Sequence, residues 1–242
     1  MDNFKFKQFT ISQDRCGMKV GTDGVLLGAW AEPYIHITAQ PNKRILDIGT
    51  GTGLIALMMA QRNSNAQITG IEIDAEAAAQ AAENCKASPW ADRINIVHGR
   101  IQDYFPPTRF DLIVSNPPYF INSLKSPDSQ RAIARNADSL PIEELMKASA
   151  RLLSQDGRLA VIVPVETYKE VERYAAIYGF FPTIRTAVHT TKEKPIKRVL
   201  IEYSLTRPQL TLYNEVCLFS QTSPSEYSSW YKELTKDFYL ND

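Results

Sequence analysis

A glycine-rich turn between a short apolar run and a helix-forming segment constrains the fold of this chain most. Residues 44–48 predict a buried strand, 54–62 predict a helix, and the link between them is Asp47-Ile48-Gly49-Thr50-Gly51-Thr52-Gly53. Glycine lets the backbone turn tightly and approach a ligand closely. A strand that turns through glycines into a helix is typical of α/β sheets that bind an adenosyl ligand beyond their strand ends.

Two details of this turn favour S-adenosylmethionine (SAM) over a dinucleotide. Gly49, Gly51 and Gly53 are spaced G-x-G-x-G, and Leu54 stands where a dinucleotide fingerprint needs its last glycine. Asp47, at the strand end, would repel a pyrophosphate and attract the ammonium group of a methionine moiety. We therefore expect these glycines and Asp47 to bind SAM.

Strand-like and helix-like segments alternate along most of the chain, which predicts a three-layer, doubly wound α/β fold with a mostly parallel sheet. Further strands are expected at 67–73, 94–98, 110–115, 158–163, 183–188 and 199–205, and helices at 75–87, 141–153 and 166–178. Gly157 and Gly179 are expected just past the ends of the last two helices. We interpret residues 1–242 as one domain, with a cap segment and small hairpin at 1–40, a core at 41–205 and a C-terminal extension at 206–242.

Two more acids follow successive predicted strands. Glu72 ends the second strand and can accept both hydroxyls of a ribose, and Asp103 follows the third strand, where it could face an adenine amine. The alternative is that these glycines and acids only mark the ends of strands and the starts of helices, where such residues are common. Three acids after three successive strands favour a ligand site.

The fourth predicted strand runs into Asn116-Pro117-Pro118-Tyr119. Two prolines remove two backbone donors and leave rigid carbonyl acceptors, and the asparagine side chain offers another acceptor. An exocyclic NH2 held by the Asn116 amide oxygen and the Pro117 carbonyl would aim its nitrogen at a methyl sulfonium, while Tyr119 stacks on the ring. The alternative is a loop breaker after a strand; the position beside the expected cofactor favours a catalytic turn.

With these motifs, the chain resembles the class I SAM-dependent methyltransferases, and within them the amino-methylating group with the motif Asn/Asp-Pro-Pro-Tyr/Phe. The cofactor and catalytic motifs cover residues 44–119. The resemblance implies a Rossmann-like, seven-stranded sheet whose last strand is antiparallel.

The resemblance narrows at residues 19–30, which run Lys19-Val20-Gly21-Thr22-Asp23-Gly24-Val25-Leu26-Leu27-Gly28-Ala29-Trp30. This stretch looks like the opening motif of the bacterial tRNA1(Val) adenine-37 N6-methyltransferase family. The resemblance implies that Lys19, Thr22 and Asp23 lie near the methionine end of SAM, and that the substrate is the adenosine next to the anticodon. From the residues alone, Thr22-Asp23 would serve equally as an N-cap.

Because positive and negative charges balance in this chain, RNA binding would need a local patch of positive charge. Lys plus Arg and Asp plus Glu each number 27, so the chain has no net charge to attract nucleic acid or an anionic membrane. Candidate RNA contacts are Lys192, Lys194, Lys197 and Arg198 between the last two predicted strands, and Arg131 and Arg135 after the catalytic turn. Phe4, Phe6 and Phe9 with their neighbouring lysines are a second candidate. It is equally possible that each cluster is an ordinary solvent-exposed surface without an RNA contact.

Other features point to a cytoplasmic protein without a metal. The three cysteines form no pair spacing, which suits a reducing compartment, and the three histidines show no metal-ligand spacing. The N-terminus has no apolar signal region, and no apolar run is long enough to span a bilayer. We expect a monomer that does not bind membranes.

Three functional hypotheses remain open at this point. The first is a tRNA adenine-N6 methyltransferase, and a DNA adenine methyltransferase is a variant that lacks support because no target-recognition insertion is present. The second is an N5-methyltransferase of a protein glutamine, since an amide NH2 presents the same two donors. Residues 1–40 leave little room for the separate helical substrate domain of such enzymes. The third is a non-catalytic SAM- or RNA-binding module, which an intact Asn-Pro-Pro-Tyr argues against.

Overall fold

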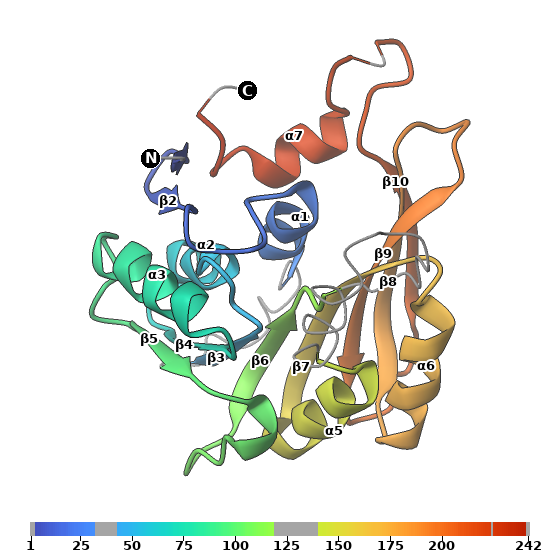
Figure 1. Cartoon of the computed structure of the whole chain (residues 1–242). Helices are drawn as coiled ribbons and strands as arrows, with labels where there is room; N and C mark the ends of the chain where they lie inside the picture. Colours follow the sequence, from blue (N-terminus) through green and yellow to red (C-terminus); the bar gives the residue numbers. More distant parts are fainter. Residues whose placement is uncertain (1–2, 32–42, 119–139, 224, 241–242) are drawn as a thin grey trace, which may run out of the picture.

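The computed structural model describes residues 3–31, 43–118, 140–223 and 225–240. Within these ranges, an eight-stranded sheet has the order β10-β8-β9-β7-β6-β3-β4-β5 and a two-stranded hairpin lies apart from it (Figure 1). The strands are β1 (Asn3–Lys5) and β2 (Thr10–Ser12) in the hairpin, and β3 (Arg44–Ile48), β4 (Gln67–Glu72), β5 (Ile94–His98), β6 (Phe110–Ser115), β7 (Leu153–Pro164), β8 (Phe181–His189), β9 (Ile196–Ser204) and β10 (Leu212–Cys217) in the sheet.

Helices cover both faces of this sheet, which confirms the three-layer α/β prediction. They are α1 (Thr22–Trp30), α2 (Leu54–Arg62), α3 (Ala75–Lys86), the 3-10 turn η2 (Ile101–Asp103), α5 (Ile142–Leu152), α6 (Tyr168–Ile177) and α7 (Ser229–Thr235). Alternate side chains of one strand point to opposite faces. On β3, Ile45 packs in a core with α1, α2 and α7, whereas Leu46 packs in a second core with α5 and α6. Strands buried on both faces explain the nearly continuous apolar runs in the sequence.

Local sequence signals place most element boundaries correctly. The observed bounds of β3, α2, β5 and β6 are the predicted ones, and the hairpin expected near the N-terminus is formed by β1 and β2. Gly179 follows α6 with a φ of 78°, a left-handed conformation that ends the helix as expected. Gly157 does not follow the end of a helix, because α5 ends at Leu152 and β7 begins at Leu153 with no intervening loop.

The sheet has one strand more than the resemblance implied. β9 is antiparallel to both β7 and β8, as expected for the last strand of the core. The additional strand, β10, comes from the segment predicted as a C-terminal extension and pairs in parallel with β8 at the edge of the sheet. Most of its side chains are exposed, so its sequence lacks the apolar alternation that predicts a strand. No helix in the described ranges is long and apolar enough to cross a membrane.

The register brings four strand ends to one edge of the sheet. Ile48 of β3 pairs with Ser115 of β6 on one side and with Ile71 of β4 on the other, and Glu72 pairs with His98 of β5. The chain winds from β3 through β4 to β5 and then returns to the opposite side of β3 for β6. Ligands of open α/β sheets bind at such a switch point, beyond the carboxyl ends of the strands.

Candidate cofactor and amine site

The glycine turn after β3 is open above its backbone. Gly49, Gly51 and Gly53 have φ values of 72°, 55° and 83°, which side chains with a Cβ rarely adopt. A Cβ added at Gly49 would meet nothing within 4 Å, and one at Gly51 would meet only the Cys16 sulfur at 3.8 Å. Gly53 differs, because a Cβ there would press on Cys85 of α3 at 3.3 Å. The first two glycines therefore leave room for a ligand, and the third lets two helices pack closely.

The side chain of Asp47 holds this turn in place through hydrogen bonds. Its side chain is fully buried, and its Oδ2 atom accepts hydrogen bonds from Thr50 Oγ1 at 2.6 Å and from the Ala56 backbone N–H at 3.1 Å. Burial raises the pKa of Asp47 to about 7, because a charged carboxylate loses its hydration there. Oδ1 is buried and has no hydrogen-bond partner among the described residues. One oxygen of Asp47 therefore fixes the turn, and its predicted contact with the ammonium group of SAM stays a prediction for the other.

Glu72 lies beside the same turn at the end of β4. Its Oε2 accepts a hydrogen bond from Gly51 N–H at 2.9 Å, and its Oε1 accepts from Ile73 N–H at 2.9 Å and Asp74 N–H at 3.0 Å. These bonds hold the carboxylate in one orientation, and an ionised carboxylate has further lone pairs for hydroxyl donors. Asp103 follows β5 in the turn η2 and is exposed, so its contact with an adenine stays a prediction.

The Asn-Pro turn is held next to the glycine turn. Ser115 Oγ donates a hydrogen bond of 2.8 Å to the Ile48 carbonyl, which joins the last residues of β6 and β3. Gly49 follows Ile48 and Asn116 follows Ser115, so this hydrogen bond also fixes the start of both turns. Asn116 is half-buried and Pro117 is buried. Pro118 is described and half-buried, whereas Tyr119, Arg131 and Arg135 lie outside the described residues.

An asparagine that the sequence analysis missed fixes the N-terminal segment against the glycine turn. The Asn84 side chain accepts from Ser12 N–H and donates to the Ser12 and Thr52 carbonyls, with all three distances at 2.9 Å. Farther along the same segment, Cys16 lies beside Gly51, and burial, helped by the charges of Glu72 and Asp74, raises the pKa of its thiol. The available signal was a polar residue three positions after Ala81, on the same face of an alanine-rich helix.

The first turn of α1 is tied to the sheet by an ion pair. Arg198 Nε donates to Asp23 Oδ2 at 2.6 Å, and Arg198 itself is the register partner of Pro164 at the end of β7. This contact brings together a predicted cofactor residue and a predicted RNA-binding residue. Thr22 and Asp23 do not form the N-cap considered as an alternative: the cap is Gly21, without a side-chain hydrogen bond. Lys19 and Thr22 are exposed just before Asp23.

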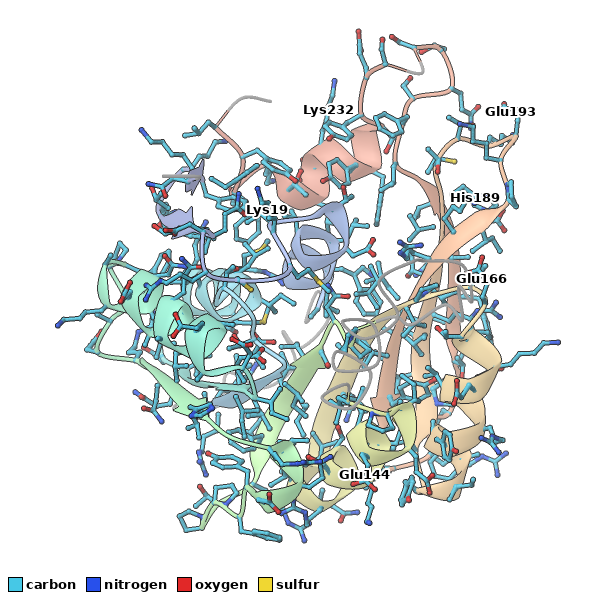
Figure 2. All side chains as sticks on the ribbon, viewed as in Figure 1. Lys19, Glu144, Glu166, His189, Glu193 and Lys232 are labelled. Carbon is cyan, nitrogen blue, oxygen red and sulfur yellow. The ribbon has the colours of Figure 1, made fainter. Side chains whose placement is uncertain are left out.

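The predicted basic loop lies between β8 and β9. Lys192, Lys194 and Lys197 are all exposed. His189 anchors the loop, because its Nδ1 lies 2.6 Å from the Lys194 carbonyl oxygen and its Nε2 lies 2.8 Å from Glu215 Oε1. Figure 2 shows His189 and Glu193 on this hairpin.

The aromatic N-terminal arm packs inward instead of offering rings to a base. Phe6 and Phe9 are 4% and 6% exposed, their rings stack on each other, and Phe6 also stacks on Tyr239. The prediction that these two rings contact RNA is therefore wrong. No group of three metal-ligating side chains is found in the part of the chain that the structure describes.

Together, the open glycine turn, the unpartnered oxygen of Asp47 and the oriented carboxylate of Glu72 fit SAM. The comparisons with known proteins point to the same cofactor. Residues 34–192 match the family model of the methyltransferase small domain.

Two relatives, from Bacteroides thetaiotaomicron and Phocaeicola vulgatus, are 46% and 47% identical to the chain. Both alignments cover 98% of this chain and 97% of the relative, and both proteins are named tRNA1(Val) (adenine(37)-N6)-methyltransferase. Among solved structures, a predicted O-methyltransferase from Agrobacterium tumefaciens has a TM-score of 0.68 at 17% identity, covering 89% of this chain and 96% of its own. A glycopeptide N-methyltransferase solved with SAM has a TM-score of 0.56 at 14% identity, and the match covers 78% of this chain and 100% of that one. These two structures therefore have the same fold as this chain.

Proposed function

Because the chain belongs to the family of tRNA1(Val) (adenine(37)-N6)-methyltransferases, we propose that it transfers a methyl group from SAM to the N6 amine of adenine 37 in that tRNA. The observation that carries the chemistry is the hydrogen bond from Ser115 to the Ile48 carbonyl. It closes the end of the β3–β6 pair, so the glycine turn and the Asn-Pro turn follow adjacent strands, which lie about 4.8 Å apart. Turns this close would bring the methyl donor and the amine together.

The glycine turn and two acids would hold the cofactor. Gly49 and Gly51 leave the backbone open to it, Glu72 would accept its ribose hydroxyls, and the unpartnered Asp47 oxygen would face its positive charge. When bound, SAM supplies a methyl group made electrophilic by the sulfonium. The cap residues Lys19, Thr22 and Asp23 would close over its methionine end, with Asp23 oriented by Arg198.

The Asn-Pro turn would hold the amine. The Asn116 amide oxygen and the Pro117 carbonyl would each accept one N–H of the exocyclic NH2. Both bonds draw the nitrogen lone pair out of conjugation with the ring and toward the methyl group. Positioning and electrostatics then supply most of the rate. No strong general base is needed before the methyl group moves, because the neutral amine attacks first and releases its extra proton to water afterwards. Tyr119 would stack on the base.

The relatives' names favour adenine over a protein glutamine, although the turn itself could hold either amine. A tRNA substrate would place the chain in the cytoplasm, and we propose that it acts there as a monomer. The exposed lysines of the β8–β9 loop would contact the tRNA backbone.

The decisive experiment is incubation with labelled SAM and total tRNA from a strain that lacks this protein. N6-methyladenosine in the digested tRNA is the expected product. Asn116→Ala should reduce methyl transfer by several orders of magnitude and leave SAM binding by calorimetry intact. Asn95→Ala, an exposed asparagine on β5, is the matched control. A parallel incubation with the protein fraction of the same strain tests the glutamine alternative, which label in protein with none in tRNA would support. Full activity of Asn116→Ala would remove its catalytic assignment.

A further inference from the structure

A groove of about 480 Å³ lies between the N-terminal hairpin, the start of α1 and the C-terminal helix α7. None of its lining residues belongs to the glycine turn or the Asn-Pro turn. Its size is in the range of small-molecule sites in proteins, about 300–1,000 Å³. The chain segments that form it are far apart in sequence, so the groove exists only in the folded protein.

Aromatic rings make the walls and floor of this groove. Tyr227 is 42% exposed, and its ring centre lies 4.5 Å from that of Tyr231, which is only 1% exposed. The Tyr231 and Tyr239 hydroxyls are 3.0 Å apart, and the Tyr239 ring packs edge-on against Phe4 at 6.3 Å. Phe219 also stacks on the Tyr227 ring, with 5.2 Å between the ring centres. The rings therefore support one another and form a fixed apolar wall, to which the exposed Tyr227 contributes an edge and not a free face.

Positive charge accompanies these rings. The only charged side chains that line the groove within the described residues are those of Lys5 and Lys232, and both are exposed. Lys232 lies 4.0 Å from Glu226, and both groups are largely in solvent, so this contact neutralises little of its charge. Aromatic rings beside lysines are the usual means of binding single-stranded nucleic acid, in which bases stack and phosphates meet cations.

The groove also borders the edge of the candidate site. Thr22 lines it, and the next residue, Asp23, is bonded to Arg198 at the end of the sheet where β7 stops. Lys19 and Lys232 lie on the part of the molecule where α1 and α7 meet (Figure 2).

We propose that this groove binds an unpaired nucleotide of the tRNA other than the methylated adenine, with its base packed against the aromatic wall at Tyr227 and with Lys5 and Lys232 contacting phosphates. The proposal rests on the proposed function, since it assigns a second contact to the same substrate. Local positive charge at this groove would allow RNA binding by a chain that has no net charge.

The test is a double charge reversal, Lys5→Glu with Lys232→Glu, measured against Lys86→Glu with Lys169→Glu. The control changes the net charge equally at exposed positions on α3 and α6. We expect the groove variant to bind tRNA at least tenfold more weakly than the control. The slope of log affinity against log salt should be smaller by about 2, one for each lost phosphate contact. Its SAM affinity should match the control.

A pair of tyrosine variants tests the contact between Tyr227 and the base separately. Tyr227→Phe should keep tRNA affinity because it keeps the ring, and Tyr227→Ala should weaken tRNA affinity about tenfold. The SAM complex of Tyr227→Ala should melt at the same temperature as that of Tyr227→Phe. Equal tRNA affinity and salt slope in the two charge-reversed variants would overturn the proposal, even if the groove then proved to bind an acidic peptide. Failure of the proposed function looks different, because the wild-type protein would then leave tRNA unmethylated.

Discussion

Replacing Asn84 with alanine should detach the N-terminal segment from the glycine turn. Asn84 is 5% exposed, and its amide makes three hydrogen bonds, two to the Ser12 backbone and one to the Thr52 carbonyl. Alanine leaves all three backbone groups without these partners in a region that water reaches poorly. A typical hydrogen bond contributes a net 0.5–1.5 kcal/mol, so we expect a loss of about 3 kcal/mol in the free energy of unfolding.

Urea unfolding followed by circular dichroism would measure this loss. Asn84→Asp is nearly isosteric and keeps the acceptor for Ser12 N–H but loses both donated bonds, so it should recover only a minor part. Lys86→Ala, on the exposed side of the same helix, should stay within about 0.5 kcal/mol of the wild type.

A second readout separates the function of this contact from its contribution to stability. Because Ser12 leads into the segment that places Cys16 beside Gly51, Asn84→Ala should raise KM for SAM several-fold while KM for tRNA stays unchanged. An unfolding midpoint and a KM for SAM both equal to those of Lys86→Ala would refute the reasoning.

Three further predictions concern the charged groups of the site. The pKa of Asp47 is raised from 3.8 to about 7, so between these values the folded state binds more protons than the unfolded state. The free energy of unfolding should therefore fall as the pH rises from about 4 to about 7, by up to about 4 kcal/mol, and level off above that. Urea titrations of Asp47→Asn should lack this component; the same slope in both proteins would contradict the assignment. Glu72→Ala should weaken SAM binding at least tenfold in calorimetry, and unchanged affinity would exclude its ribose contact. Charge reversal at Lys192, Lys194 and Lys197 should weaken tRNA binding and reduce its salt dependence; no change would place the main RNA surface elsewhere.

The sequence by itself determined the elements whose signals are local. The apolar runs of β3 and β6, the glycines after β3 and the prolines after β6 each depend on residues within a few positions of one another. Parallel strands align their carboxyl ends, so the order of these motifs along the chain also predicted that Glu72 and Asn116 would meet at one edge of the sheet.

Only the tertiary structure decided which side chains face one another across long distances in sequence. It paired Asp23 with Arg198, bridged Ser12 to Thr52 through Asn84, and turned Phe6 into the core. The edge strand β10 also escaped prediction, because its pairing with β8 depends on backbone hydrogen bonds that any sequence can make. Such contacts carry no periodic signal, since each depends on packing that exists only after the sheet and its helices have assembled.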